Sequence, residues 1–88
     1  MNRYHQLMLI TAEECGELVQ SCSKMMRHAE QDSEIDEKQR ASFVEEVGDV
    51  LAMIMLIIQY GYASEKELEE RIKVKHDKLR TWSDLFDE

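Results

Sequence analysis

The sequence predicts an all-α protein: a hairpin of two long helices followed by a third helix. The 88-residue chain contains no proline, and 34% of its residues are charged and 43% hydrophobic, a mixture that favours long helices over sheets or disorder. Apolar residues recur at helical spacing in three segments, and turn-forming residues separate these segments. We predict one domain covering residues 1–88, because a chain this short holds a single core.

Residues 3–28 form the first predicted helix, along which two stripes run side by side. One stripe is mostly apolar, repeats at alternating spacings of four and three, and is predicted as a heptad-type seam: Tyr4, Met8, Thr11, Cys15, Leu18, Cys22, Met25 and Ala29. The other stripe carries carboxylates at its centre and basic groups two to three turns later: Ile10, Glu14, Glu17, Ser21, Lys24 and His28. Lys24 and His28 are predicted either to contact phosphate or to end the helix in solvent.

Residues 30–37 are polar and predict a loop, after which Ser33 or Asp36 starts the next helix. This second helix, residues 37–60, is apolar around most of its circumference from Val47 to Ile58. A helix of this kind is buried on several sides, and a short chain cannot easily surround it. We therefore predict a subunit interface here, with a four-helix-bundle core formed by homo-oligomerisation, in preference to a single-chain three-helix bundle.

A turn at residues 60–63 precedes the third helix, with Gly61 at the C-cap of the second. Ser64 is the predicted N-cap, and Glu67 completes a capping box. The helix has an apolar face made of Leu68, Ile72, Leu79, Trp82 and Phe86. Its middle is basic, through Lys73, Lys75, Lys78 and Arg80.

Two acidic pairs stand out, Glu14 with Glu17 and Glu46 with Asp49, each spaced i, i+3. Residues three apart share one face of a helix, so each pair points two carboxylates the same way. A carboxylate in an apolar helix is costly to bury unless it is paired or metal-bound, and Asp49 lies beside the apolar run 50–58. If the two helices pack together, four carboxylates converge, and a hard divalent cation such as Mg²⁺ would relieve their repulsion.

Gly16 and Gly48 each lie inside a predicted helix, one residue before the last carboxylate of an acidic pair. A glycine in a helix interior costs about 1 kcal/mol relative to alanine. The matched placement predicts a close approach of helices or room for a ligand at both positions.

Charge and composition exclude several classes of protein. A net charge of −8 argues against nucleic acid or an anionic membrane as partner, although a metal ion can still bridge acidic side chains and a nucleotide. The run 50–58 is too short to span a bilayer, and the N-terminus lacks a signal-peptide pattern. Cys15 and Cys22 lie about 10.5 Å apart along one helix, too far to form a disulfide, which predicts a reduced, cytoplasmic setting.

The residues of the two motifs resemble the signature of the all-α nucleoside triphosphate pyrophosphohydrolase superfamily. Glu13-Glu14-x-Gly16-Glu17-Leu18 and Glu45-x-x-Gly48-Asp49-Val50-Leu51 look most like single-domain MazG-like proteins, and the resemblance spans roughly residues 4–82. It implies a Mg²⁺-dependent enzyme, with Mn²⁺ as a possible substitute. This enzyme would cleave a ribo- or deoxynucleoside triphosphate between the α and β phosphates, releasing a monophosphate and pyrophosphate. Similar proteins are homodimers or homotetramers with four-helix-bundle cores.

The same resemblance implies roles for individual residues. The metal-ligand positions of the family match Glu14, Glu17, Glu46 and Asp49. Glu13 matches a glutamate that orients or deprotonates the attacking water, which makes it the catalytic candidate. Lys75 and Lys78 resemble basic residues that hold phosphates on the last helix of the family, and join Lys24 as predicted phosphate contacts.

Two other functions stay open at this stage. One is a phosphoribosyl-ATP pyrophosphohydrolase of histidine synthesis. Such enzymes share the core motif but have different residues around the second motif. The other is a non-catalytic helical interaction module whose acidic patch is merely solvated. Tyr4, His5 and Trp82 could stack on a nucleobase, although a role in the core or at its rim is the simpler interpretation of each.

Overall fold

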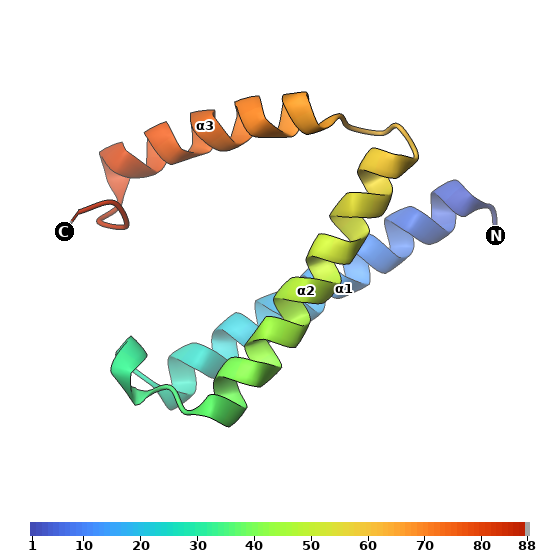
Figure 1. Cartoon of the computed structure of the whole chain (residues 1–88). Coiled ribbons are helices and arrows are strands. Elements are labelled where there is room, and N and C mark those ends of the chain that lie inside the picture. Colours follow the sequence, from blue (N-terminus) through green and yellow to red (C-terminus); the bar gives the residue numbers. More distant parts are fainter. Residues whose placement is uncertain (88) are drawn as a thin grey trace. The chain divides into compact units, whose positions relative to one another are not determined.

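The computed structural model describes residues 1–87, and the regular elements of these residues are all helices, with no strand among them. The elements are α1 (Arg3–His28), the short 3₁₀ helix η1 (Asp32–Glu34), α2 (Glu37–Gln59) and α3 (Glu65–Trp82) (Figure 1). The predicted all-α class and its helices are therefore confirmed, with bounds within one residue for α1 and α2. The chain divides into two compact units, one up to Ile57 and one from Ile58 onward, and each is described by itself.

Side chains close the ends of the two hairpin helices. At the start of α1 the His5 backbone N–H donates to Oδ1 of Asn2 at 2.8 Å. At the start of α2 the Gln39 N–H donates to Asp36 Oδ1 at 2.8 Å, and the Asp36 N–H donates to Gln39 Oε1 at 3.1 Å. This reciprocal cap satisfies backbone donors that have no partner inside the helix. Of the two predicted starts, Asp36 is the one that begins α2.

In the first unit α1 and α2 run antiparallel beside each other, joined by the segment that contains η1 (Figure 1). The packed face of α1 has Leu7 and Ser21 buried, with half-buried side chains between and after them: Thr11, Glu14, Leu18 and Met25. The predicted seam is therefore only partly right, because four of its members are exposed: Tyr4, Met8, Cys15 and Cys22. α2 packs against the surface of α1 that lies between the two stripes. Glu14 is therefore part of the packed face, whereas half of the predicted seam is exposed.

On α2, Met53 is buried, while part of the apolar run stays open to solvent. Val44, Leu51 and Met55 are 50%, 54% and 69% exposed, and they follow one another at helical spacing. We call these three residues the α2 stripe. Asp49 is exposed, so its expected burial inside an apolar helix is wrong. It lies one turn beyond Glu46 and close enough to Glu14 for its charge to raise the pKa of that group, yet its side chain stays open to solvent.

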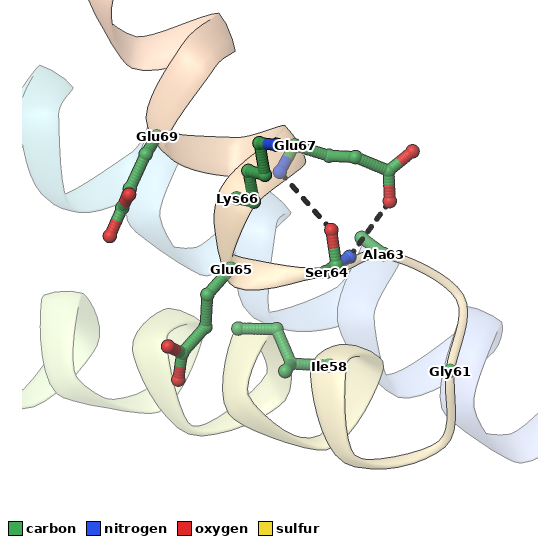
Figure 2. A pocket seen from close by; sticks show the side chains of 8 residues that line it. All are labelled: Ile58, Gly61, Ala63, Ser64, Glu65, Lys66, Glu67 and Glu69. Atoms are coloured by element: carbon green, nitrogen blue, oxygen red, sulfur yellow. Dashed lines mark hydrogen bonds between the residues drawn. The ribbon is translucent and has the colours of Figure 1, made fainter.

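The second unit begins with the last turn of α2, which Gly61 ends with a φ of 81°. This left-handed conformation favours glycine and confirms its predicted C-cap role. Figure 2 shows the next cap: the Glu67 N–H donates to Ser64 Oγ at 3.1 Å, and the Ser64 N–H donates to Glu67 Oε1 at 3.0 Å. The predicted capping box at the start of α3 is therefore confirmed.

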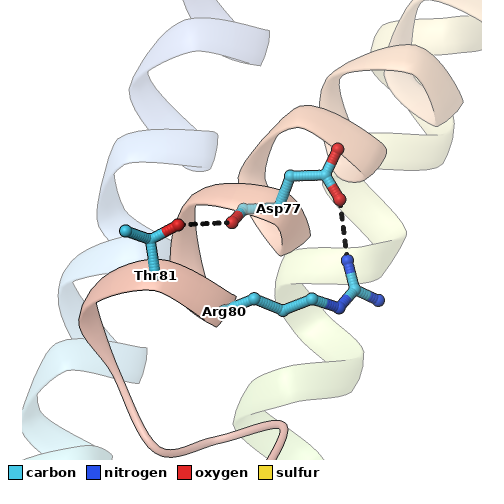
Figure 3. A network of polar contacts seen from close by, with 3 residues as sticks. All are labelled: Asp77, Arg80 and Thr81. Atoms are coloured by element: carbon cyan, nitrogen blue, oxygen red, sulfur yellow. Dashed lines mark hydrogen bonds and ion pairs between the residues drawn. The ribbon is translucent and has the colours of Figure 1, made fainter.

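α3 keeps most of its side chains in solvent, although Leu68 and Leu79 are half-buried. Near its end Arg80 donates to the Asp77 carboxylate at 2.8 Å, and the Thr81 hydroxyl donates to the Asp77 carbonyl (Figure 3). Phe86 does not extend the apolar face as predicted, because the helix ends at Trp82. The Phe86 ring instead lies against Arg80, whose guanidinium carbon is 4.6 Å from the ring centroid.

Candidate metal centre

Three carboxylates from two helices meet at the middle of the hairpin. Glu14 and Glu17 come from α1 and Glu46 from α2, and one carboxylate oxygen of each lies within 4.8 Å of the others. The i, i+3 spacing places the α1 pair on one face, and the antiparallel α2 brings Glu46 to the same place. The predicted convergence of acidic side chains is thus present for these three.

Glu14 and Glu46 are the half-buried members of this cluster. The Oε2 atom of each is buried and has no hydrogen-bond partner among the described residues. Burial raises the pKa of Glu14, and the negative charges of Glu17 and Asp49 raise it further. The pKa of Glu46 is raised first by burial and then by Glu17. Both shifts have the same physical cause: negative charge is concentrated here where water cannot fully solvate it.

Asp49 and Glu13 flank this cluster. Asp49 does not belong to the group of three, yet its charge helps to raise the pKa of both Glu14 and Glu46. Glu13 is exposed, and its charge contributes to the shift at Glu14. The four predicted ligands and the predicted catalytic glutamate therefore fall within one electrostatically coupled region.

The donor set suits a hard divalent cation. Every candidate ligand is a carboxylate oxygen, which is the ligand type that Mg²⁺ takes. The two buried oxygens without partners are the strongest sign of fit, because unsatisfied buried carboxylate oxygens are costly unless a cation or a donor binds them. Glu14, Glu17 and Glu46 would hold such an ion, with Asp49 beside them.

The glycines of the two motifs leave space around them. A Cβ atom added at Gly16 or Gly48 would meet no other atom within 4 Å. The predicted close approach of helices at these positions is therefore wrong within this chain, because α1 and α2 touch along other faces. The alternative prediction, room for a ligand, agrees with the open space.

A cavity of about 190 Å³ adjoins the carboxylates and includes Lys24, which places this predicted phosphate contact near them. It is lined by Glu17, Gln20, Ser21, Lys24, Ser42 and Glu46, and we call it the carboxylate cavity. A second cavity of about 180 Å³ shares three of these residues and continues toward the loop, lined by Ser21, Lys24, Met25, His28, Lys38, Gln39 and Ser42. We call it the loop-end cavity.

The sequence reasoning missed the α2 side of both cavities. Ser42 lies four residues before Glu46, and Lys38 lies four before Ser42, so all three share one helix face. Extending the carboxylate face of α2 backward by two turns would have found them. These positions were not predicted because neither carries an acidic side chain like those of the motif.

The other predicted phosphate contacts, Lys75 and Lys78, lie on α3 in the second unit, and their role stays a prediction. The Lys75 ammonium is 5.3 Å from the centroid of the Trp82 ring. A cavity of about 630 Å³ surrounds the turn before α3 (Figure 2). Its side chains include Glu65, Glu67 and Glu69, and it contains none of the motif carboxylates.

One of three comparisons with known proteins gave a match. The profile of the MazG nucleotide pyrophosphohydrolase domain matches residues 2–81, a span that includes both motifs. Searches among curated proteins and among solved structures gave no significant match. Within residues 1–87, none of the helices combines the length and hydropathy that a bilayer crossing requires. Because the profile covers most of the chain and both carboxylate motifs, this protein belongs to the MazG nucleotide pyrophosphohydrolase family, whose members generally depend on a divalent metal ion.

Proposed function

We propose that this protein is a Mg²⁺-dependent pyrophosphohydrolase that converts ribo- or deoxynucleoside triphosphates to monophosphates and pyrophosphate. The observation that carries the proposal is the meeting of Glu14, Glu17 and Glu46 within 4.8 Å in a chain of the MazG family. The buried, unpartnered oxygens of Glu14 and Glu46 support it, because they favour a bound cation.

The residues divide the chemistry among them. Glu14, Glu17, Glu46 and Asp49 hold the metal ion. When bound, this ion neutralises charge on the phosphates and makes a neighbouring water more acidic. Glu13, exposed at the edge of the cluster, orients the attacking water and accepts its proton. The water oxygen forms a bond to phosphorus, the α–β anhydride bond breaks, and pyrophosphate leaves.

Basic side chains complete the binding of the substrate in this proposal. Lys24 lines the carboxylate cavity and contacts phosphate there. Lys75 and Lys78 contribute further phosphate contacts from α3. An ammonium group acts as a point charge toward phosphate oxygens, so each contact strengthens substrate binding without taking part in bond cleavage.

We further propose that the chain, as a single domain over residues 1–88, assembles into a homodimer or homotetramer with a four-helix-bundle core. The exposed α2 stripe supports this, because a helix with so much apolar surface gains free energy when another helix covers it. Among the hydrophobic side chains of residues 1–87, only Leu7 and Met53 are buried. We place the protein in the cytoplasm, where free thiols such as those of Cys15 and Cys22 stay reduced.

The decisive experiment is a pyrophosphate-release assay with Mg²⁺ on the standard ribo- and deoxynucleoside triphosphates, with products identified by chromatography. We expect monophosphate plus pyrophosphate, and loss of both when Asp49 is replaced by Asn. Diphosphate plus inorganic phosphate would contradict the proposed bond. If no triphosphate reacts, phosphoribosyl-ATP is the next substrate, and its hydrolysis would assign the alternative enzyme. Absence of turnover on every substrate would favour a non-catalytic interaction module.

A further inference from the structure

The loop-end cavity has no role in the reaction described above, yet it opens beside the carboxylate cavity. The two cavities share Ser21, Lys24 and Ser42. Their volumes are about 190 and 180 Å³, and neither alone reaches the roughly 300–1,000 Å³ of a typical small-molecule site. The shared residues make the two cavities neighbours, so a ligand held by the carboxylates through a metal ion would extend past them toward the loop.

The walls of the loop-end cavity differ from those of its neighbour. Met25 contributes a half-buried apolar wall, and no acidic residue lines the cavity among residues 1–87. An apolar wall is a poor surface for a phosphate, whose oxygens all need donors or cations. It is a good surface for a flat ring, because thioether sulfur makes favourable contacts with aromatic systems. The phosphates of the substrate are thus placed at the carboxylates, and its base at Met25.

Three of the polar groups around this wall, those of Lys24, Lys38 and Gln39, are available chiefly as donors, whereas the hydroxyls of Ser21 and Ser42 and the ring of His28 can donate or accept. Lys24 and Lys38 carry ammonium groups, which donate and cannot accept; neither lysine forms an ion pair with another described residue. Gln39 already uses its Oε1 to accept the Asp36 backbone N–H at 3.1 Å, which leaves its amide NH₂ as the group to offer a ligand. A base that presents a carbonyl oxygen matches the donors of Lys38 and Gln39, whereas an exocyclic amino group finds acceptors only at the two hydroxyls and the histidine ring.

We propose that the loop-end cavity binds the nucleobase and that Lys38 selects bases bearing a carbonyl in place of an exocyclic amino group. This inference rests on the proposed function and deepens it. Uracil, thymine, guanine and hypoxanthine carry such a carbonyl, while cytosine and adenine carry the amino group at the matching ring position. Lys38 is a specificity-determining residue in this assignment, and the bond cleavage does not depend on it.

Matched substrate pairs test the assignment. dUTP and dCTP differ at one exocyclic group and its neighbouring ring nitrogen, and so do ITP and ATP. We expect kcat/KM to favour dUTP and ITP by roughly tenfold, since a donor left without its acceptor weakens binding of the wrong base. Replacing Lys38 with Met should bring both ratios close to one. Lys73→Met, an exposed lysine on α3, serves as the matched control and should leave both ratios as in the wild type.

Three results would overturn the inference while leaving the proposed function intact. One is equal turnover of both members of each pair by the wild type. Another is an unchanged preference in Lys38→Met. The third is a uniform loss on all four substrates with weaker inhibition by pyrophosphate, which would assign the cavity to phosphates. Circular dichroism establishes that each variant is folded.

Absence of turnover by the wild type would instead count against the proposed function. Calorimetric titration with dUMP and dCMP then tests the cavity without catalysis. Tighter binding of dUMP that disappears in Lys38→Met supports the inference, and equal binding of the two monophosphates, or no binding, overturns it.

Discussion

The two carboxylate motifs have the same internal asymmetry. Glu14 and Glu46, the first carboxylates of the pairs, are half-buried with unpartnered oxygens, whereas Glu17 and Asp49, the second carboxylates, are exposed. We call them the inner and the outer carboxylates. The inner pair carries the electrostatic cost, since burial and neighbouring charge raise the pKa of both groups. The hairpin therefore holds a concentration of negative charge that its own residues do not neutralise, and solvent reaches this charge at the outer carboxylates.

The largest expected effect is on turnover, where inner and outer carboxylates should behave alike. Glu46→Gln and Asp49→Asn should each lower kcat/KM by at least about a hundredfold, because metal ligation stabilises transition-state charge by several kcal/mol and each 1.36 kcal/mol is a factor of ten. Glu70→Gln, an exposed carboxylate on α3, is the control and should retain activity. Steady-state pyrophosphate release measures all three, and normal activity in Asp49→Asn would remove the outer carboxylates from the site.

Metal binding should show next in thermal stability. A divalent ion at about a hundred times its dissociation constant stabilises the folded state by about 2.7 kcal/mol, so the melting temperature should rise with millimolar Mg²⁺ or Mn²⁺. We expect a smaller rise in melting temperature for Glu46→Gln than for the wild type, because Glu46 supplies one of the buried oxygens. Circular dichroism melts with metal and with chelator give the shift. An identical shift in wild type and Glu46→Gln would show that the ion binds elsewhere.

A smaller effect is the pH dependence of the metal-free protein. The pKa values of Glu14 and Glu46 are raised in the folded state, so this state binds more protons than the unfolded chain between the usual and the raised values. The free energy of unfolding should therefore fall as pH rises through that window, and the whole cost is present above the raised pKa values. Denaturant titrations in chelator across this range measure the slope.

Substitutions at the inner and outer carboxylates should change this slope to different extents. Glu46→Gln should reduce the slope and stabilise the metal-free protein at neutral pH, since an uncharged amide replaces a raised carboxylate. Asp49→Asn should change the slope less, because it removes only one of the several contributions that raise the pKa of Glu14 and Glu46. A steeper slope in Glu46→Gln than in the wild type would contradict the assigned cause.

The smallest effect concerns the glycines that precede the outer carboxylates. Gly16→Ala should stabilise the protein by about 0.5–1 kcal/mol, since a Cβ there meets no atom within 4 Å and alanine is the better helix former. Gly48 lies one turn from both Val44 and Leu51 of the α2 stripe. If a second subunit covers that stripe as proposed, Gly48→Ala should give a smaller gain. Chemical denaturation combined with sedimentation of both variants measures stability and subunit number together.

Much of the helical content could be read directly from the residues. Asp36, Gly61 and Ser64 act through neighbours within three residues, so their roles as helix ends depend on local chemistry. The pairing of Glu14 with Glu17 follows from helix geometry for the same reason. These features need no knowledge of what lies across the interface, which is why sequence reasoning located them.

The rotation of each helix about its own axis depended on the packed structure. α1 carries two adjacent stripes of similar spacing, and contact with α2 selects the line between them, which exposes Cys15 and brings Glu14 into the packed face. The packing of α2 on this face joins Lys24 to Lys38 around one cavity, while Asp49 of α2 stays exposed. Helical periodicity specifies which residues share a face, whereas the direction in which a face points is set by burial against a partner from a distant part of the chain.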